Sequence, residues 1–230
     1  MFGNFDFQAI VRGWHALIFE GLAFTLEVTF LAMIGGTILG TVFAMMRLSS
    51  TKPLAWFAGA YVNLLRSVPL VMVIFWFYFM APYIGAWIIG AERPVQVGAF
   101  ASALITFILF EACYYCEIMR AGIQSIPAGQ ANAGYALGFS YWQLMRLVIL
   151  PQAFRNMLPV LLTQTIVLFQ DVSLVYIISL PDFVTIASKI AQRDNRLVEM
   201  YLFVAVVYFA LCLALSYVVR RLRARLTIIR

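Results

Sequence analysis

Long apolar runs separated by short polar segments form the main pattern of this chain. A helix that crosses a bilayer needs about 20 mostly apolar residues, and five stretches reach that length. The spans are expected at residues 21–46, 70–89, 95–119, 154–180 and 200–219, with an apolar approach to the second span from Leu54. The pattern therefore predicts an all-α integral membrane protein with five transmembrane helices.

The segments between the spans differ in the density of Lys and Arg. More of these residues lie on the side of the tail at residues 220–230 than on the side of residues 1–20. The richer side has Arg47, Lys52, Arg120, Arg146, Arg155, Arg220, Arg221, Arg223, Arg225 and Arg230, and the other side has Arg12, Arg93, Lys189, Arg193 and Arg196. Cytoplasmic loops are enriched in Lys and Arg. We therefore expect an extracytoplasmic N-terminus and a cytoplasmic C-terminus.

The loop at residues 120–153 is too polar for a span and too apolar for a flexible linker. Pro127 is typical of the first turn of a short helix, and Gly138 of its end. Ser140 and Gln143 match the S-x-x-Q capping box at the start of a second helix, which is expected to end before Pro151. Two short helices in a cytoplasmic loop indicate a docking surface for another protein.

The polar segment at residues 181–199 lies between the fourth and fifth spans, on the outer side. Two interpretations remain open for it. It forms a helix that covers the outer face or contacts an extracytoplasmic partner, or it is a solvated connector.

Composition agrees with a membrane protein and excludes several functions. The chain of 230 residues is 64% hydrophobic and 11% charged, whereas soluble domains are about a quarter charged. Its net charge of +6 is dispersed over short loops and the tail, which favours a role in membrane topology over nucleic-acid binding. Cys113 and Cys116 lie in an apolar run without a second pair, so no metal or redox site is expected.

The motifs of common catalytic sites are missing from the sequence. It contains no Gly-x-x-x-x-Gly-Lys-Ser/Thr motif, so we do not expect the chain to bind ATP by itself. It also contains no HExxH motif and no Ser/His/Asp arrangement. These observations argue against an enzyme.

Polar residues in the fourth span are candidates for a substrate pathway. Gln164 and Asp171 are seven residues apart and share a helix face, and Gln170 lies on the adjoining strip with Thr163. Ser173 follows in the same span. Such residues usually face a partner helix or a water-filled path. Both interpretations remain open, and a role in the pathway or its gating is considered for Asp171.

Charged residues in the apolar regions give further candidates. Arg66 precedes Pro69, which is expected to break the helix that enters the second span. Its guanidinium could pair with Asp171 or Glu117, or bind a substrate carboxylate. Glu117 is also expected to pair with Arg120, three residues later.

The chain resembles the polar amino-acid family of ABC importer permeases, and in particular the glutamate/aspartate type. The resemblance covers nearly the whole chain and depends on five segments taken together. They are YVNLLRSVPL (61–70), YYCEIMRAGIQSIPAGQ (114–130), ALGFSYWQ (136–143), LPQAFRNMLP (150–159) and LFQDVSLVY (168–176). The resemblance implies a type I ABC importer permease fold in the bacterial inner (cytoplasmic) membrane.

The resemblance also implies that residues 129–138 form the coupling helix, which seats in a groove on a cytoplasmic ATPase. The residues implied in this contact are Gly129, Gln130, Asn132, Ala133, Gly134, Leu137 and Gly138. Asn132 stands where the family commonly has an acidic residue, so the contact is expected to depend on shape more than on charge. Val172 stands where relatives often have Thr, which removes a hydroxyl from the pathway strip.

The implied partners are two ATP-binding subunits, a second homologous permease, an extracytoplasmic solute-binding protein, the amino-acid substrate and membrane lipid. ATP and Mg would bind to the partner ATPase, and this chain would have no cofactor of its own. The implied mechanism is alternating access coupled to ATP hydrolysis. The alternatives are a stand-alone ion-coupled carrier or channel that uses Asp171, Glu111 and Arg66, and a membrane scaffold without transport activity.

Overall fold

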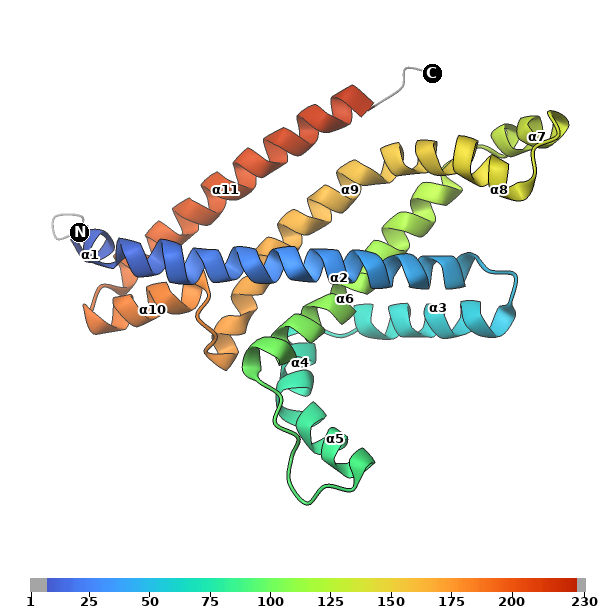
Figure 1. Ribbon diagram of the computed structural model, residues 1–230. Coiled ribbons are helices and arrows are strands. Elements are labelled where there is room, and N and C mark those ends of the chain that lie inside the picture. Colours follow the sequence, from blue (N-terminus) through green and yellow to red (C-terminus); the bar gives the residue numbers. More distant parts are fainter. Residues whose placement is uncertain (1–7, 227–230) are drawn as a thin grey trace.

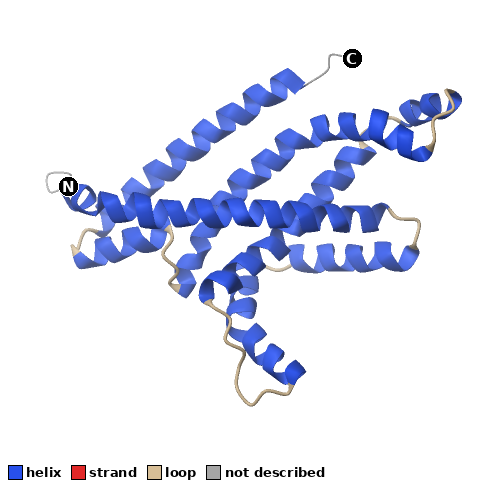
Figure 2. Cartoon of the chain, viewed as in Figure 1, coloured by secondary structure: helices blue, strands red, loops and turns tan. Residues whose placement is uncertain are grey.

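The computed structural model describes residues 8–226, and the regular elements in this part of the chain are all helices (Figures 1 and 2). Five helical segments are long and apolar enough to cross a membrane. They are Gln8–Leu48, Leu70–Ile89, Ala99–Gln124, Tyr141–Ile178 and Leu197–Leu226. The prediction of an all-α protein with five spans is confirmed.

The first span begins at Gln8, well before residue 21. It comprises α1 (Gln8–His15), the π-helical segment η1 (Ala16–Leu22) and α2 (Ala23–Leu48). Its early part is helical because Ala9, Gly13 and Leu17 form a buried stripe four residues apart. The part of the expected 1–20 segment that the structure describes is therefore helix, and residues 1–7 lie outside the described residues.

The centre of the fold is the contact between α2 and α6 (Ala99–Gln124). A methyl group placed on Gly36 would lie 3.1 Å from Cβ of Glu111, and one on Gly40 would lie 2.8 Å from Cβ of Tyr115. Small residues at such positions let two membrane helices approach closely. These two glycines thus allow α6 to pack directly on α2.

The break expected near Pro69 is confirmed. The helix α3 (Lys52–Arg66) lies alongside α2, and the chain resumes as α4 (Leu70–Phe75), η2 (Trp76–Met80) and α5 (Ala81–Ile89). Pro69 has an extended ψ of 135°, because a residue just before a helix start does not adopt helical angles. Figure 1 shows α4 and α5 leading away from the rest of the chain.

The loop after the third span contains α7 (Ala128–Ala136) and α8 (Tyr141–Leu144). From α8 the chain continues through the π-helical segment η3 (Met145–Ile149) into α9 (Leu150–Asp171). The prediction that the second loop helix ends before Pro151 is wrong. Pro151 occupies the first turn of α9, directly after the π-helical segment, where the hydrogen-bonding pattern of the helix changes.

The last part of the chain is η4 (Val172–Ile178), α10 (Phe183–Arg193) and α11 (Leu197–Leu226). The segment expected as either a covering helix or a solvated connector is mostly the helix α10, one face of which packs on η1 and α11. Asp182 caps α10 by accepting hydrogen bonds from the backbone N–H groups of Val184 (2.9 Å) and Thr185 (3.0 Å). Burial nevertheless raises the pKa of the Asp182 carboxyl above its ordinary value.

Candidate functional site

The loop helix α7 is connected to the spans by contacts on both sides. The hydroxyl of Ser125, just after α6, donates to the carbonyl of Gly122 (2.7 Å) and accepts from the amide of Asn156 on α9 (2.9 Å). Pro127 lies immediately before the first residue of α7. The position of α7 is thus set by α6 and α9 together.

The seven residues assigned to the coupling contact divide into two groups. Gly129, Gln130, Asn132, Ala133, Leu137 and Gly138 are exposed, and Leu137 is 76% exposed. Gly134 is buried against α8 instead, and a methyl group placed on it would lie 2.5 Å from Cδ1 of Leu144. Gly134 therefore lets α7 pack inside the chain and does not face outward.

The turn after α7 agrees with the sequence. Gly138 has a φ of +81°, a conformation that glycine adopts at the end of a helix without steric cost. Gln143 donates its backbone N–H to the hydroxyl of Ser140 (3.4 Å), and its side-chain oxygen accepts from the backbone N–H of Ser140 (2.8 Å). The predicted capping box is confirmed.

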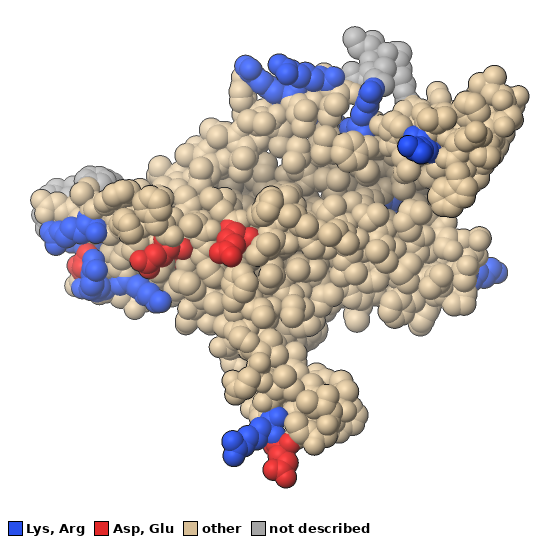
Figure 3. Space-filling view, in the orientation of Figure 1, with Lys and Arg blue, Asp and Glu red and all other residues tan. Residues whose placement is uncertain are grey.

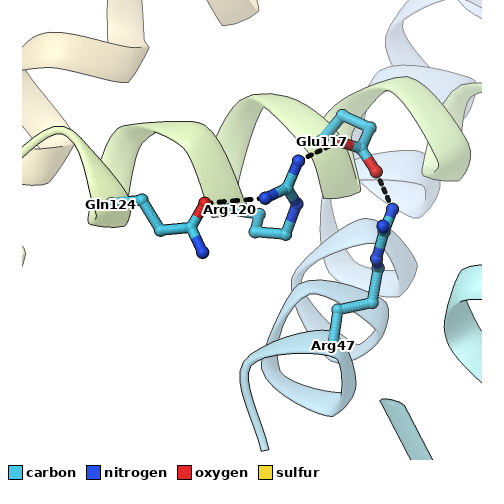
Figure 4. Close-up of polar contacts among 4 residues, drawn as sticks. All are labelled: Arg47, Glu117, Arg120 and Gln124. Carbon is cyan, nitrogen blue, oxygen red and sulfur yellow. Dashed lines mark hydrogen bonds and ion pairs between the residues drawn. The ribbon is translucent and has the colours of Figure 1, made fainter. Parts of the chain in front are cut away.

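An ion-pair network lies where α2 and α6 end (Figure 4). Glu117 accepts a hydrogen bond from Arg120 (2.6 Å), as predicted, and its other carboxylate oxygen pairs with Arg47 of α2. Arg120 also donates to the side-chain oxygen of Gln124 (2.6 Å), the last residue of α6. The network fixes the end of α6, from which the chain leads to α7.

The polar residues of α9 point toward two different helices. The amide of Gln164 donates to both carboxylate oxygens of Glu111 on α6 (3.1 and 3.3 Å), and Glu111 is fully buried. The exposed Gln170 has its amide nitrogen 3.3 Å from Sγ of Cys212 on α11. Gln164 and Gln170 therefore do not form one cluster.

Asp171 and Ser173 lie at the end of α9 and the start of η4, and both are half-buried. Val172, which stands between them, is fully buried. The change from α-helix to the tighter η4 at this point alters the direction of the following side chains.

Arg66 is exposed at the end of α3, with its guanidinium carbon 5.2 Å from the centre of the Tyr114 ring. This is a cation–π distance. Among the described residues Arg66 has no ion pair with Asp171 or Glu117, and Glu117 is already paired with two arginines. The structural pairing predicted for Arg66 is therefore wrong, whereas the tyrosine contact could not be seen in the sequence because the two residues lie 48 positions apart.

Arg66, Glu111 and Asp171 nevertheless lie in one region. The Arg66 guanidinium contacts the Tyr114 ring, and Val172, the neighbour of Asp171, belongs to the apolar cluster on which Tyr114 packs. Tyr114 follows Glu111 by three residues on α6, so both project toward the same side of that helix. This region contains one cation and two carboxyl groups near the end of α3, where the chain is already broken by Pro69. Glu111 is buried and bonded to Gln164, so Arg66 and Asp171 are the charged groups of this region that remain for other partners.

Metal binding has no support in the described part of the chain. Within residues 8–226 no group of three or more His, Cys, Asp and Glu side chains is placed to bind a metal ion. Cys113 and Cys116 are buried and unbridged.

Comparison with known proteins gives one family and several relatives. The family model described as "Binding-protein-dependent transport system inner membrane component" matches residues 36–228. The glutamate/aspartate import permease protein GltK of Escherichia coli O157:H7 is 52% identical over 222 residues, which cover 96% of this chain and 98% of GltK. The glutamine transport system permease protein GlnP of Escherichia coli K12 is 32% identical over 228 residues, covering 98% and 100% of the two chains.

A solved structure has the same fold over almost the whole length. It is that of an amino acid ABC transporter with histidines, and it superposes with a TM-score of 0.86 at 32% sequence identity. The superposition covers 96% of this chain and 99% of the other.

Proposed function

The chain belongs to the family of binding-protein-dependent transport system inner membrane components, and we propose from this that it is the permease subunit of an ABC importer for glutamate and aspartate. The observation that supports this substrate class most strongly is the 52% identity to a glutamate/aspartate import permease over 96% of the chain. The same fold in an amino acid ABC transporter supports the permease role.

The proposed partners follow the family. Two ATP-binding subunits, a second homologous permease and an extracytoplasmic solute-binding protein complete the transporter. ATP and Mg bind to the partner ATPase, where hydrolysis supplies the energy, and this chain forms part of the passage. The exposed surface of α7, with Gly129, Gln130, Asn132 and Ala133, seats on the ATPase.

The helical path from α8 to α9 suggests how movement at α7 reaches the passage. Gly134 on α7 contacts Leu144 on α8, and the helix then continues without interruption to Asp171. At about 1.5 Å per residue, the 20 residues from Leu144 to Gln164 span roughly 30 Å. A displacement of α7 when the ATPase dimer closes is thereby transmitted to the polar residues of α9.

The substrate is proposed to pass near the charges around Tyr114. The guanidinium of Arg66 offers two parallel donors to a carboxylate, and Asp171 offers an acceptor for the ammonium group of an amino acid. Gln164, Gln170 and Ser173 would line the passage on α9 and η4 as the substrate moves between the two permeases.

Uptake measurements test the substrate class. The chain is produced together with its companion subunits in a host that lacks its own glutamate and aspartate importers, and uptake of labelled glutamate, aspartate and glutamine is compared. Saturable uptake of the two acidic amino acids supports the proposal, whereas uptake of glutamine alone contradicts the substrate class.

The same uptake measurement without ATP hydrolysis tests the permease role. A hydrolysis-deficient ATPase subunit is expected to abolish uptake. If the purified chain alone moved the same substrates into liposomes under an ion gradient, the alternative of a stand-alone carrier would replace the proposal.

The role of Arg66 is tested by Arg66→Gln, with Arg93→Gln as the matched control. Both arginines are exposed, and each variant removes one positive charge. A hydrogen bond to a charged group contributes about 1.5–3 kcal/mol, so loss of a substrate contact should raise the KM for glutamate roughly 10- to 150-fold. An unchanged KM in Arg66→Gln would remove Arg66 from the site.

A further inference from the structure

A groove of about 1150 Å³ lies between the first half of α9, the C-terminal part of α11 and the start of α7. Figure 1 shows α11 running alongside α9 toward the end of the molecule where α7 lies. The groove lies apart from Gln164, Asp171 and Tyr114, and none of these residues lines it.

The groove has a positively charged lining. Arg155 of α9 and Arg220 and Arg223 of α11 line it, and no Asp or Glu is among its described lining residues. Lys and Arg side chains gather over the C-terminal end of α11 and near the start of α9 (Figure 3). The gathering of three arginines in one lining favours an anion as the occupant.

The groove also has a polar part and an apolar part. The side chains of Gln130, Gln152 and Asn156 lie with the arginines in the lining, whereas Pro159, Val160 and Val219 continue it along the two spans. A small free anion would use only the polar part. An amphipathic anion would place its charged group among the arginines and its hydrocarbon against the apolar wall.

The position of the groove matches the level of lipid headgroups. Arg220 and Arg223 lie near the end of the segment Leu197–Leu226, and Arg155 lies inside the long segment Tyr141–Ile178, next to residue 154 where the fourth span is expected to begin. Both positions belong to the side that is richer in Lys and Arg, which is expected to be cytoplasmic. Basic pockets between membrane helices on the cytoplasmic side are suited to anionic headgroups.

We propose that this groove binds an anionic phospholipid, with the phosphate held by Arg155, Arg220 and Arg223 and an acyl chain along α9 and α11. Arginine recognises phosphate through paired N–H donors. The bound lipid would fill the space between α9 and α11. It would thereby connect α9, which leads from α7 to the polar residues, with the last span.

Two double variants separate this site from general attraction to a charged membrane. Arg220→Gln/Arg223→Gln removes two groove arginines. Arg221→Gln/Arg225→Gln removes two arginines of the same tail that do not line the groove, and each variant lowers the formal charge of +6 by two. The measurement is the dissociation constant of fluorescent phosphatidylglycerol from the full-length chain in neutral detergent, with phosphatidylcholine as the uncharged probe.

The groove variant is expected to bind phosphatidylglycerol about 30-fold more weakly, at about 1 kcal/mol for each arginine near an anionic lipid. The tail control should change the constant less than about threefold, because its arginines lie outside the groove. Phosphatidylcholine should bind weakly to all proteins. If the groove variant inserts poorly, Arg155→Gln, at an exposed position of α9, tests the site independently. It is also expected to weaken the binding of phosphatidylglycerol.

Three results would overturn the proposal. The first is an equal loss of binding in the groove variant and the tail control. The second is displacement of the lipid by inorganic phosphate or glutamate at a concentration no higher than that of soluble phosphatidylglycerol needed for the same effect. Such a result would indicate a site for a free anion. The third is cysteine cross-linking that places a second permease in the groove of the assembled transporter.

Discussion

Replacing Gly134 by alanine should displace α7 from α8 and separate ATP hydrolysis from uptake. The added methyl group would lie 2.5 Å from Cδ1 of Leu144, whereas ordinary contacts begin at 3.4 Å, so one of the two groups must move by about 0.9 Å (3.4 minus 2.5). Leu144 is only 3% exposed, which limits where its side chain can go.

The magnitude follows from two opposing effects. Overpacking of this kind costs about 1–3 kcal/mol, while alanine is favoured over glycine within a helix by about 1 kcal/mol. Gly134→Ala should therefore destabilise the docking of α7 by roughly 0–2 kcal/mol. Gly129→Ala is the matched control, because a methyl group there meets no atom within 4 Å, and it should stabilise α7 slightly.

Two assays report the effect. Hydrogen exchange of the α7 amides in the full-length chain should be faster in Gly134→Ala than in the native protein, and unchanged or slower in Gly129→Ala. In the reconstituted transporter, Gly134→Ala should lower the amount of glutamate taken up per ATP hydrolysed.

A compensating change tests the cause. Leu144→Val removes the δ carbons that the new methyl group would meet, so Gly134→Ala/Leu144→Val should recover slow exchange and part of the uptake. If Gly134→Ala exchanges and transports like Gly129→Ala, which gains the same alanine preference without the overpacking, or if Leu144→Val makes its defect worse, the packing explanation for Gly134 is refuted.

Three further predictions concern contacts between elements, each checked by thermal unfolding in detergent. Glu117→Gln should destabilise the protein by about 0.5–1 kcal/mol, because its partly exposed carboxylate pairs with two arginines, and added salt should reduce the difference from the native protein. Gln164→Leu should lower the free energy of unfolding by about 1–3 kcal/mol, because it leaves the buried Glu111 without its donor. A double variant that also carries Glu111→Leu should be more stable than Gln164→Leu, and an equal or lower stability would contradict this account. Asp182→Ala should cost about 0.5–2 kcal/mol through loss of the α10 cap, and Asp182→Asn should cost less because one acceptor remains.

Features determined by nearby residues could be predicted from the sequence. The five spans follow from apolar runs of sufficient length, the helix break follows from Pro69, and the capping box follows from Ser140 and Gln143. Glu117 and Arg120 are one helical turn apart, so their ion pair could be predicted as well. Each of these features depends on residues that belong to one continuous stretch of the sequence.

Contacts between distant segments could not be predicted in this way. Gln164 reaches Glu111 across 53 positions, and nothing in the spacing of either span indicates that the two share a face. The sequence shows Arg47 only as a positive charge between two spans, whereas the packing of α2 on α6 brings it to Glu117. The exposed Arg66 meets Tyr114 because α3 folds back beside α2, which depends on the whole bundle.

The predicted helix end before Pro151 was wrong for a different reason. A proline signals a helix boundary when it removes a hydrogen bond, but Pro151 falls in the first turn after a π-helical segment. There the N–H of Leu150 bonds to the carbonyl of Met145, five residues back. Sequence periodicity does not reveal such a change of hydrogen-bonding pattern.

The contacts of the first span have a consequence for the order in which the protein is made. The glycines of α2 acquire their partner only when α6 has been synthesised, more than 50 positions later. The start of α2 acquires its partner even later. The hydroxyl of Thr25 accepts a hydrogen bond from the backbone N–H of Phe183, 158 positions away. The first helix to enter the membrane therefore completes its packing only after most of the chain has left the ribosome.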